Sequence, residues 1–261
     1  MTTLAEVMAD IRMETAVLDD VLSKLDEAGW HKETPAVGWD THDTIAHLAD
    51  TNDVMFDSIT EGSRDLTTEI SSLAQNREAW VSDPNAVNLF TAAQVERGRN
   101  MEWEAVYAWW RSSCARLHET IESLDPGGRY RWGPNMISPL SLGSARMMET
   151  WAHSLDVHDA AGLDYEQTDR VAHIAFLGLR ALAYAFNLEG VDPPGPVRLE
   201  LKLPSGAEWS GGPRGAPSVI RGSAVDWCRI VTRRDRDGAA GRLQTEGPDG
   251  EHVIKYGRAF L

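Results

Sequence analysis

Helical periodicity over the first two thirds of the chain is the feature that most limits the fold. In several long stretches apolar residues recur at steps of three, four or seven. This spacing puts them on one face of an amphipathic helix. We therefore predict long helices at residues 4–25, from Asp40 or Thr41 to about 59, at 91–124, 141–161 and 167–188. An up-and-down bundle is the economical way to bury such faces. Residues 62–90 lack this periodicity and are predicted as a loop with short helical pieces, a long insertion of the kind that often covers a site.

The period changes after the segment Val191-Asp-Pro-Pro-Gly-Pro196. Apolar and charged residues then alternate over residues 197–203, which is typical of a half-buried strand, and residues 206–210 suit a hairpin partner. Further strands are predicted at 218–221 and 242–245, with helices at 224–232 and 251–260. The sequence thus predicts an α+β protein with a helix bundle at residues 1–190 and a small α+β domain at 191–261.

Charge and cysteine content narrow the class of function. The chain has 40 acidic and 25 basic residues and a net charge of -15, which argues against binding to nucleic acid or to an anionic membrane. No apolar run approaches the roughly 18 to 20 residues of a membrane span, and the first residues carry acids, so we expect a cytoplasmic protein. The two cysteines, Cys114 and Cys228, are far apart. Any metal site must therefore use histidine and carboxylate ligands.

One predicted helix carries the densest group of reactive side chains. Glu149 and His153 are four residues apart, so both point from one helix face, and Asp156 continues that face. A carboxylate and an imidazole can chelate a divalent ion, and His47 on the second helix could supply a third ligand across the bundle. Three protein ligands leave one position open, as in catalytic zinc sites.

The same residues also have simpler interpretations that need no metal. A glutamate four residues before a histidine also arises by chance and is then a weakly favourable surface pair. A lone helical histidine such as His47 is more often hydrogen-bonded in a core. His158 lies off the Glu149 face, and His173 on the fifth helix either faces a cavity or packs.

Several segments resemble a known family. The pattern W-x-x-x-T-P-A-x-G-W at residues 30–39, followed by residues 43–49 with His47, is similar to the entry to the first metal ligand in DinB-like bundles of the mycothiol-dependent maleylpyruvate isomerase family. Residues 145–160 resemble its second ligand helix, and residues 219–234 its sterol-carrier-like C-terminal domain. Together with residues 168–178, the ligand helix is most similar to a subfamily named only as metal-binding. Ser154-Leu155 departs from the Gly-Gln common in the family, which indicates a different substrate.

The resemblance implies specific roles. His47, Glu149 and His153 would be the metal ligands, with zinc or another divalent ion as the metal and mycothiol as the thiol co-substrate. The arginine that the family uses in its small domain corresponds to Arg234, with Arg233 adjacent and Arg221 as another candidate. Arg234 would anchor the substrate, or else belong to a solvated helix end. From its position one turn beyond His153, Asp156 could orient a ligand imidazole or accept a proton, or else be a surface acid.

These roles predict one main function and two alternatives. A metal with an open position lowers the pKa of a bound thiol or water near neutral pH. We expect a thiol-using isomerase or transferase acting on a small electrophile with a carboxylate or carbonyl group, as a monomer or homodimer. The thiol would come from outside, although Cys114 could approach in space. The rivals are a metal-dependent hydrolase or cyclase, and a non-catalytic binder whose metal site is closed by His158 or His173.

The tryptophan content is unusually high, with ten residues in the chain. Four of them, Trp30, Trp39, Trp132 and Trp151, flank the expected ligand segments. They are expected either to wall a pocket or to pack in the core.

Overall fold

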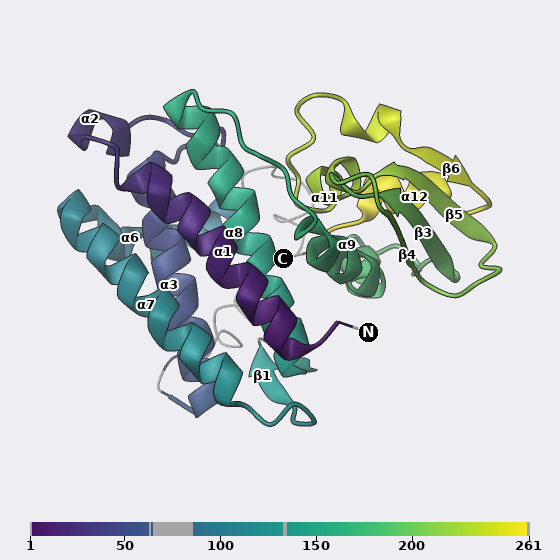
Figure 1. Cartoon of the computed structure of the whole chain (residues 1–261), viewed down its shortest axis with the longest axis horizontal. Coiled ribbons are helices and arrows are strands. Elements are labelled where there is room, and N and C mark those ends of the chain that lie inside the picture. Colours follow the sequence, from purple (N-terminus) through teal and green to yellow (C-terminus); the bar gives the residue numbers. More distant parts are fainter. Residues whose placement is uncertain (1, 63, 65–85, 133–134, 260–261) are drawn as a thin grey trace. The chain divides into compact units, whose positions relative to one another are not determined.

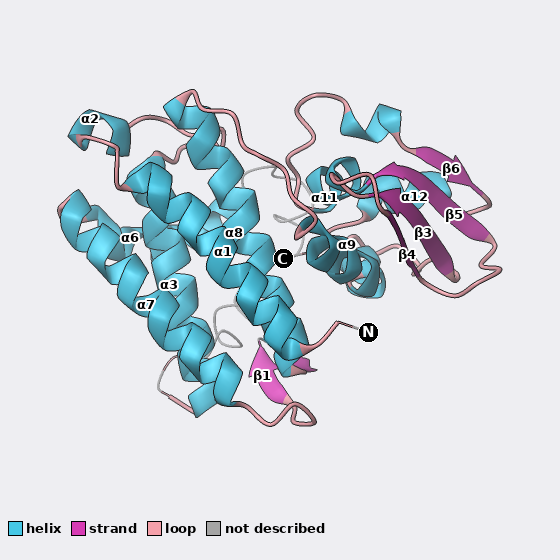
Figure 2. Ribbon diagram, viewed as in Figure 1, coloured by secondary structure: helices cyan, strands magenta, loops and turns pink. Residues whose placement is uncertain are grey.

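The computed structural model describes residues 2–62, 64, 86–132 and 135–259. The chain divides into two compact units, Met1–Tyr165 and Glu166–Leu261. The first unit is helical and the second contains a four-stranded sheet (Figures 1 and 2). The α+β fold class expected from the sequence is therefore confirmed. The prediction for residues 62–90 lies largely outside the described residues, and its last five residues already belong to a helix.

Four helices of 19 to 23 residues and a short hairpin make up most of the described part of the first unit (Figure 1). Its elements are α1 (Leu4–Leu22), α2 (Glu27–Trp30), α3 (Thr41–Thr60), α6 (Ala86–Arg99), α7 (Trp103–Ser123), β1 (Tyr130–Trp132), β2 (Asn135–Ile137) and α8 (Pro139–Ala161). The main packing pairs are α3 with α7 and α1 with α8, and α6 lies along α3.

Local sequence explains where three of these helices begin. Thr3 and Glu6 form a reciprocal capping box at the start of α1. Asp40 caps α3 by accepting a hydrogen bond from the Asp43 amide at 2.8 Å. Ser138 caps α8, with a proline at the first helical position, so α8 starts two residues earlier than expected.

Apolar side chains from the four long helices form a core in the first unit. The Trp30 and Trp103 rings stack in it with centroids 5.5 Å apart. The buried members are Leu18, Val21, Leu22, Trp30, Ile45, Ala46, Leu48, Ala49, Val106, Trp110, Cys114 and Val157. Trp30 is therefore a core residue, as is Trp151, which is 1% exposed.

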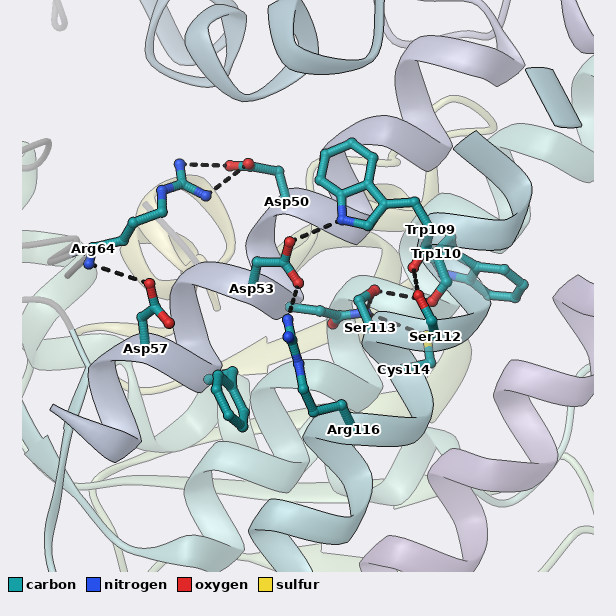
Figure 3. A network of polar contacts seen from close by, with 12 residues as sticks. Asp50, Asp53, Asp57, Arg64, Trp109, Trp110, Ser112, Ser113, Cys114 and Arg116 are labelled. Carbon is teal, nitrogen blue, oxygen red and sulfur yellow. Dashed lines mark hydrogen bonds and ion pairs between the residues drawn. The ribbon is translucent and has the colours of Figure 1, made fainter. Parts of the chain in front are cut away.

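A polar network joins α3 to its neighbours (Figure 3). Asp50 accepts two hydrogen bonds from Arg64, at 2.7 and 3.1 Å. One turn later, Asp53 accepts from the Trp109 indole at 2.8 Å and from Arg116 at 2.5 Å. The two contacts of Asp53 join α3 to α7 and so help to fix the rotation of α3 about its axis.

The expected helix at residues 91–124 is interrupted. The chain forms α6 and α7 with a break at residues 100–102, where the Met101 amide donates to the Gly98 carbonyl at 2.8 Å and Glu102 is extended. No glycine or proline marks residues 100–102. His42 instead contacts the Met101 carbonyl oxygen at 3.1 Å, so a tertiary contact accompanies the break.

The second unit combines helices with a sheet of strand order β4-β3-β5-β6. β3 pairs with β4 antiparallel and with β5 parallel, and β5 pairs with β6 antiparallel. Its elements are α9 (Val171–Arg180), α10 (Leu182–Leu188), β3 (Val197–Lys202), β4 (Glu208–Gly211), β5 (Ser218–Ser223), α11 (Ala224–Val231), a 3-10 turn (Ala239–Arg242), β6 (Gln244–Glu246) and α12 (Gly250–Tyr256).

The helix expected at 167–188 differs from the structure in two ways. It is bent by 57° between α9 and α10. It also belongs to the second unit, because α9 packs on α11: the Trp227 indole donates to the Ala175 carbonyl at 3.2 Å, and a Cβ added at Gly178 would lie 2.9 Å from Val231. The unit boundary thus falls at 165/166 and not at 190/191, where the change of period predicts it. Within the described ranges no single helix is long and apolar enough to cross a membrane, but the bent α9–α10 pair passes that test by length and composition.

Candidate metal centre

Helices α3 and α8 bring His47, Glu149 and His153 together inside the first unit. One ligand atom from each of these residues, called here the candidate triad, lies within 4.8 Å of the others. The Glu149 Oε2 atom is 3.5 Å from Nε2 of His47 and 3.6 Å from Nε2 of His153. Direct charge-assisted hydrogen bonds are shorter, about 2.7–2.9 Å. These distances are long for direct hydrogen bonds, so the three ligand atoms are better placed to bind a shared cation than to bond to one another.

On each imidazole, the Nδ1 atom lies close to an oxygen acceptor. The Nδ1 atom of His47 is 3.1 Å from Oε1 of Gln94, and Nδ1 of His153 is 3.1 Å from Oδ2 of Asp156. The Gln94 amide group donates in turn to Oγ1 of Thr51 at 3.3 Å, which orients its oxygen toward His47. With the hydrogen on Nδ1 of each ring, the Nε2 lone pair is left for a metal. This is the arrangement in which an outer acceptor sets the tautomer of a ligating histidine.

Burial and mutual contacts set the charges of the triad. Burial lowers the pKa of His47, although the hydrogen bond with Glu149 acts in the opposite direction. Burial also opposes ionisation of Glu149, but hydrogen bonds from His153 and His47 outweigh it and hold the pKa of Glu149 well below its usual value. A neutral imidazole and an ionised carboxylate are the forms that bind a metal.

One of the flanking tryptophans contacts the triad. The Trp39 ring lies 5.1 Å from the His47 ring and 6.0 Å from the His153 ring, between centroids, and the side chain is buried. Its position follows from the turn before α3, where the Thr34 amide and hydroxyl both donate to the Trp39 carbonyl at 2.9 Å. Trp39 therefore forms one wall of the site, while Trp30 and Trp151 belong to the core.

Helix α6 supplies Gln94 because it lies very close to α3. A Cβ added at Gly98 would be 2.4 Å from the Cβ of Ala46, so only glycine allows this approach. Arg97 on α6 also pairs with Asp50, one turn after His47. These contacts place the Gln94 amide behind the His47 ring.

The other histidines considered from the sequence lie outside the triad. His158 is buried, its Nδ1 is 2.7 Å from the Ser154 carbonyl oxygen, and its ring contacts Tyr165 edge-on with centroids 5.0 Å apart. His173 belongs to α9 in the second unit. Among the described residues neither joins the cluster of ligand atoms around Glu149.

The candidate arginines also belong to the second unit. Arg234 follows the end of α11 and donates to the Thr232 carbonyl at 2.6 Å. Arg233 has a left-handed backbone with φ of 59°, and Arg221 pairs with Glu200 and Glu246, each at 2.8 Å. Arg221 thus already has two carboxylate partners on the sheet. The role of Arg234 stays a prediction.

Cys114 is a poor nucleophile in this structure. Burial raises its pKa to about 12, against the opposing effects of Arg146 and of a hydrogen bond from Asn52. Since the thiolate is the reactive form, the Cys114 thiol is inert near neutral pH. A second group of acids and histidine, Asp40, His42 and Asp43 at the start of α3, is occupied by local contacts with the Asp43 amide, the Met101 carbonyl and Arg99.

Two residues near the triad had not been identified from the sequence. Gln94 gave no signal, because a polar residue on an amphipathic helix is ordinary. Arg146 did carry one: it lies three residues before Glu149 and seven before His153, so the same helical periodicity puts it on their face.

Comparisons with known proteins show the family to which the chain belongs. A family model described as mycothiol maleylpyruvate isomerase N-terminal domain matches residues 11–158. The uncharacterized proteins MT0041 and Rv0036c, from two strains of Mycobacterium tuberculosis, are each 36% identical over 97% of this chain and 94% of their own length.

Two solved structures share the fold. A crystal structure of the mycothiol-dependent maleylpyruvate isomerase matches with a TM-score of 0.57 and 16% identity, over 95% of this chain and 96% of that one. A crystal structure of a histidine-to-alanine mutant of that enzyme matches with a TM-score of 0.55 and 17% identity over the same shares.

Proposed function

Because the chain belongs to the mycothiol maleylpyruvate isomerase N-terminal domain family, we propose that it is a metal-dependent isomerase or transferase that uses a low-molecular-weight thiol. The thiol is mycothiol, and the second substrate is a small electrophile with a carbonyl or carboxylate group. The observation that carries the proposal is the candidate triad, in which three ligand atoms from two helices converge within 4.8 Å.

The donor set of the triad fits a divalent ion, with zinc as the first choice. Two imidazole nitrogens and one carboxylate oxygen suit zinc, and the absence of cysteine from the cluster disfavours a closed structural site. The outer contacts from Gln94 and Asp156 are of the kind that accompany ligating histidines. His47, Glu149 and His153 would therefore hold the ion.

Three further features favour catalysis over a closed binding site. Within the part of the chain that the structure describes, no fourth His, Cys, Asp or Glu joins the cluster, which supports an open position. When bound, the ion would lower the pKa of a thiol toward neutrality. The inert Cys114 leaves no competing protein thiol among the first unit's described residues, so the sulfur comes from outside.

The proposed isomerisation is balanced in atoms and electrons. The thiolate sulfur adds to a carbon of a cis double bond conjugated with a carbonyl, and the π electrons move to the carbonyl oxygen. The former double bond now rotates. Return of the electron pair expels the sulfur and leaves the trans isomer. With a different electrophile the sulfur–carbon bond persists, and the product is a thioether.

The chain's own residues serve this reaction by positioning. Asp156 and Gln94 hold the two imidazoles, and Trp39 covers one side of the site against water. Arg234 is proposed to bind a carboxylate of the substrate, as the family resemblance implies. An Arg234→Ala variant should then raise the KM for an acidic substrate, and an unchanged KM would make Arg234 a surface charge.

Metal analysis and thiol titration test the proposal. Purified protein should contain one divalent ion per chain, and His47→Ala and His153→Ala should lose it. His31→Ala is the matched control, since His31 is half exposed, pairs with Asp40 and contacts the His42 ring, and it is not part of the triad. Retention of the metal by both triad variants would refute the site.

The thiol is tested separately by calorimetric titration of the metal-loaded protein with mycothiol. Saturable heat at a ratio of one thiol per metal is expected. No heat from protein that does hold the metal would refute the thiol-dependent reaction.

A further inference from the structure

A closed ring of hydrogen bonds joins His47 to two buried polar side chains. The Thr51 hydroxyl donates to the His47 carbonyl at 2.8 Å. The Gln94 amide group donates to Oγ1 of Thr51 at 3.3 Å, and its oxygen lies 3.1 Å from Nδ1 of His47. All three side chains are buried, so water is largely excluded as a substitute partner. The orientation of each group in the ring therefore constrains the next one.

The Thr51 hydroxyl sets the direction of these hydrogen bonds. A hydroxyl has a single hydrogen, and the backbone carbonyl of His47 can only accept it. Oγ1 of Thr51 is then left as an acceptor for its second bond. Within the ring only the NH2 group of Gln94 can donate to it, so the amide oxygen faces Nδ1 of His47. With the amide in this orientation, the ring hydrogen belongs on Nδ1.

Glu149 attracts the same ring hydrogen to the opposite nitrogen. Its Oε2 atom is 3.5 Å from Nε2 of His47, and its low pKa keeps the carboxylate ionised. Although this contact is long, an ionised carboxylate favours an N–H group on Nε2, the atom that would have to bind the metal. Gln94 alone does not decide between the two nitrogens, because a free amide can present either its oxygen or its NH2 group. A fixed amide is needed to keep Nε2 available.

We propose that Thr51 is a positioning residue of the candidate metal centre, because its hydroxyl fixes the orientation of the Gln94 amide and thereby the tautomer of His47. Thr51 acts through Gln94 and not as a ligand. Without the hydroxyl, Gln94 is free to turn its NH2 group toward Nδ1, and the ring hydrogen then moves to Nε2. The inference rests on the proposed function and adds to it a residue that no sequence pattern indicates.

The zinc affinity of Thr51→Val tests this role with little change in side-chain shape. Loss of a neutral hydrogen bond should weaken zinc binding roughly 2- to 10-fold in competition with a chromogenic chelator. Thr51→Ser keeps the hydroxyl and should bind zinc as the native protein does. Thr44→Val is the matched control, since Thr44 is buried on the same helix and donates to the Asp40 carbonyl at the same 2.8 Å. Native affinity in Thr51→Val, or an equal loss in Thr44→Val, would overturn the inference.

A double-mutant cycle shows whether Thr51 acts through the amide. In the Gln94→Leu background the amide is already absent, so Thr51→Val should cause no further loss of zinc affinity. If the two losses add fully in the double variant, Thr51 acts by another route and the inference fails.

Long-range proton–nitrogen NMR correlations of the metal-free proteins report the tautomer itself, and the His47→Ala spectrum identifies the His47 signals. Burial lowers the pKa of His47, so the ring is neutral at neutral pH. Native protein should carry the hydrogen on Nδ1, and Thr51→Val should move part or all of it to Nε2. A native ring with its hydrogen on Nε2 would contradict the proposal, and so would a Thr51→Val ring that keeps it on Nδ1. A purely structural role for Thr51 would not change the tautomer.

The same zinc titrations separate this inference from the proposed function. If native protein binds no zinc, the proposed function fails, and the role of Thr51 at a metal centre fails with it. If native and Thr51→Val proteins bind zinc equally well, only the role of Thr51 fails.

Discussion

The hydrogen bond from His153 to Asp156 offers the sharpest prediction. Asp156 is fully buried, and its carboxylate lies 3.1 Å from Nδ1 of His153. An Asp156→Asn variant keeps the shape of the side chain but removes the charge. Its amide can also turn its NH2 group toward Nδ1, and then the ring hydrogen moves to Nε2, which can no longer bind a metal.

The size of the effect follows from the type of hydrogen bond. A hydrogen bond to a charged group contributes about 1.5–3 kcal/mol, and loss of an outer acceptor typically weakens metal binding about 10- to 100-fold. We expect Asp156→Asn to fall in this range. Gln94→Leu removes a neutral acceptor from His47 at the same 3.1 Å, so its loss should be smaller, about 0.5–1.5 kcal/mol or roughly 2- to 10-fold.

Competition with a chromogenic chelator at pH 7.5 measures these affinities, and circular dichroism of the metal-free variants confirms that they fold. Asp20→Asn is the control, because Asp20 is exposed and pairs with Lys24 on the outside of α1. A folded Asp156→Asn protein with native zinc affinity would show that Asp156 does not orient His153. A larger loss for Gln94→Leu than for Asp156→Asn would refute the charge argument.

The remaining predictions concern stability and the buried thiol. Burial, together with Arg12 and Arg146, lowers the pKa of His118 to about 4. Between about pH 6.5 and pH 4, His118 is therefore protonated in the unfolded state but neutral in the folded state. Stability should therefore fall by on the order of 3 kcal/mol as pH drops from about 6.5 to about 4, and urea unfolding of His118→Leu should show a flatter pH dependence; an unchanged slope would contradict this. Because the pKa of Cys114 is about 12, iodoacetamide at pH 8 should alkylate it roughly 100-fold or more slowly than free cysteine, and Cys114→Ala should keep its metal; fast alkylation of the folded protein would contradict the burial. Gly98→Ala should lower the free energy of unfolding by about 1–3 kcal/mol and weaken metal binding, since the new Cβ pushes α6 and Gln94 away from Ala46; native stability would show that the helices separate freely.

Local signals in the sequence account well for the long helices and for one part of the site. The Glu149 and His153 pair follows from helical periodicity alone, because residues four apart share a face wherever the helix ends. Asp40, one of the two starts predicted for α3, is its cap, whereas Ser138 caps α8 two residues before the predicted start. The meeting of His47 with that pair is a tertiary event, which a helix bundle allows and which the family resemblance implies.

Long-range packing explains what was missed. The break before α7 occurs at residues compatible with a helix, and its visible partner is His42, 59 positions away. The unit boundary was placed at the proline-rich segment 191–196, but the face of α9 packs on α11, which lies beyond that segment in the sequence. Gln94 reaches His47 only because Gly98 lets α6 approach α3, and neither residue signals this by itself.

X-ray absorption of the zinc-loaded protein with and without mycothiol tests the central claim most directly. The account predicts a first shell of nitrogen and oxygen only in the absence of thiol, and one added sulfur at about 2.3 Å in its presence. Asp156→Asn, measured under conditions that saturate it with zinc, should show the same added sulfur. A zinc shell that is unchanged by saturating mycothiol would contradict an open, thiol-binding metal site on His47, Glu149 and His153.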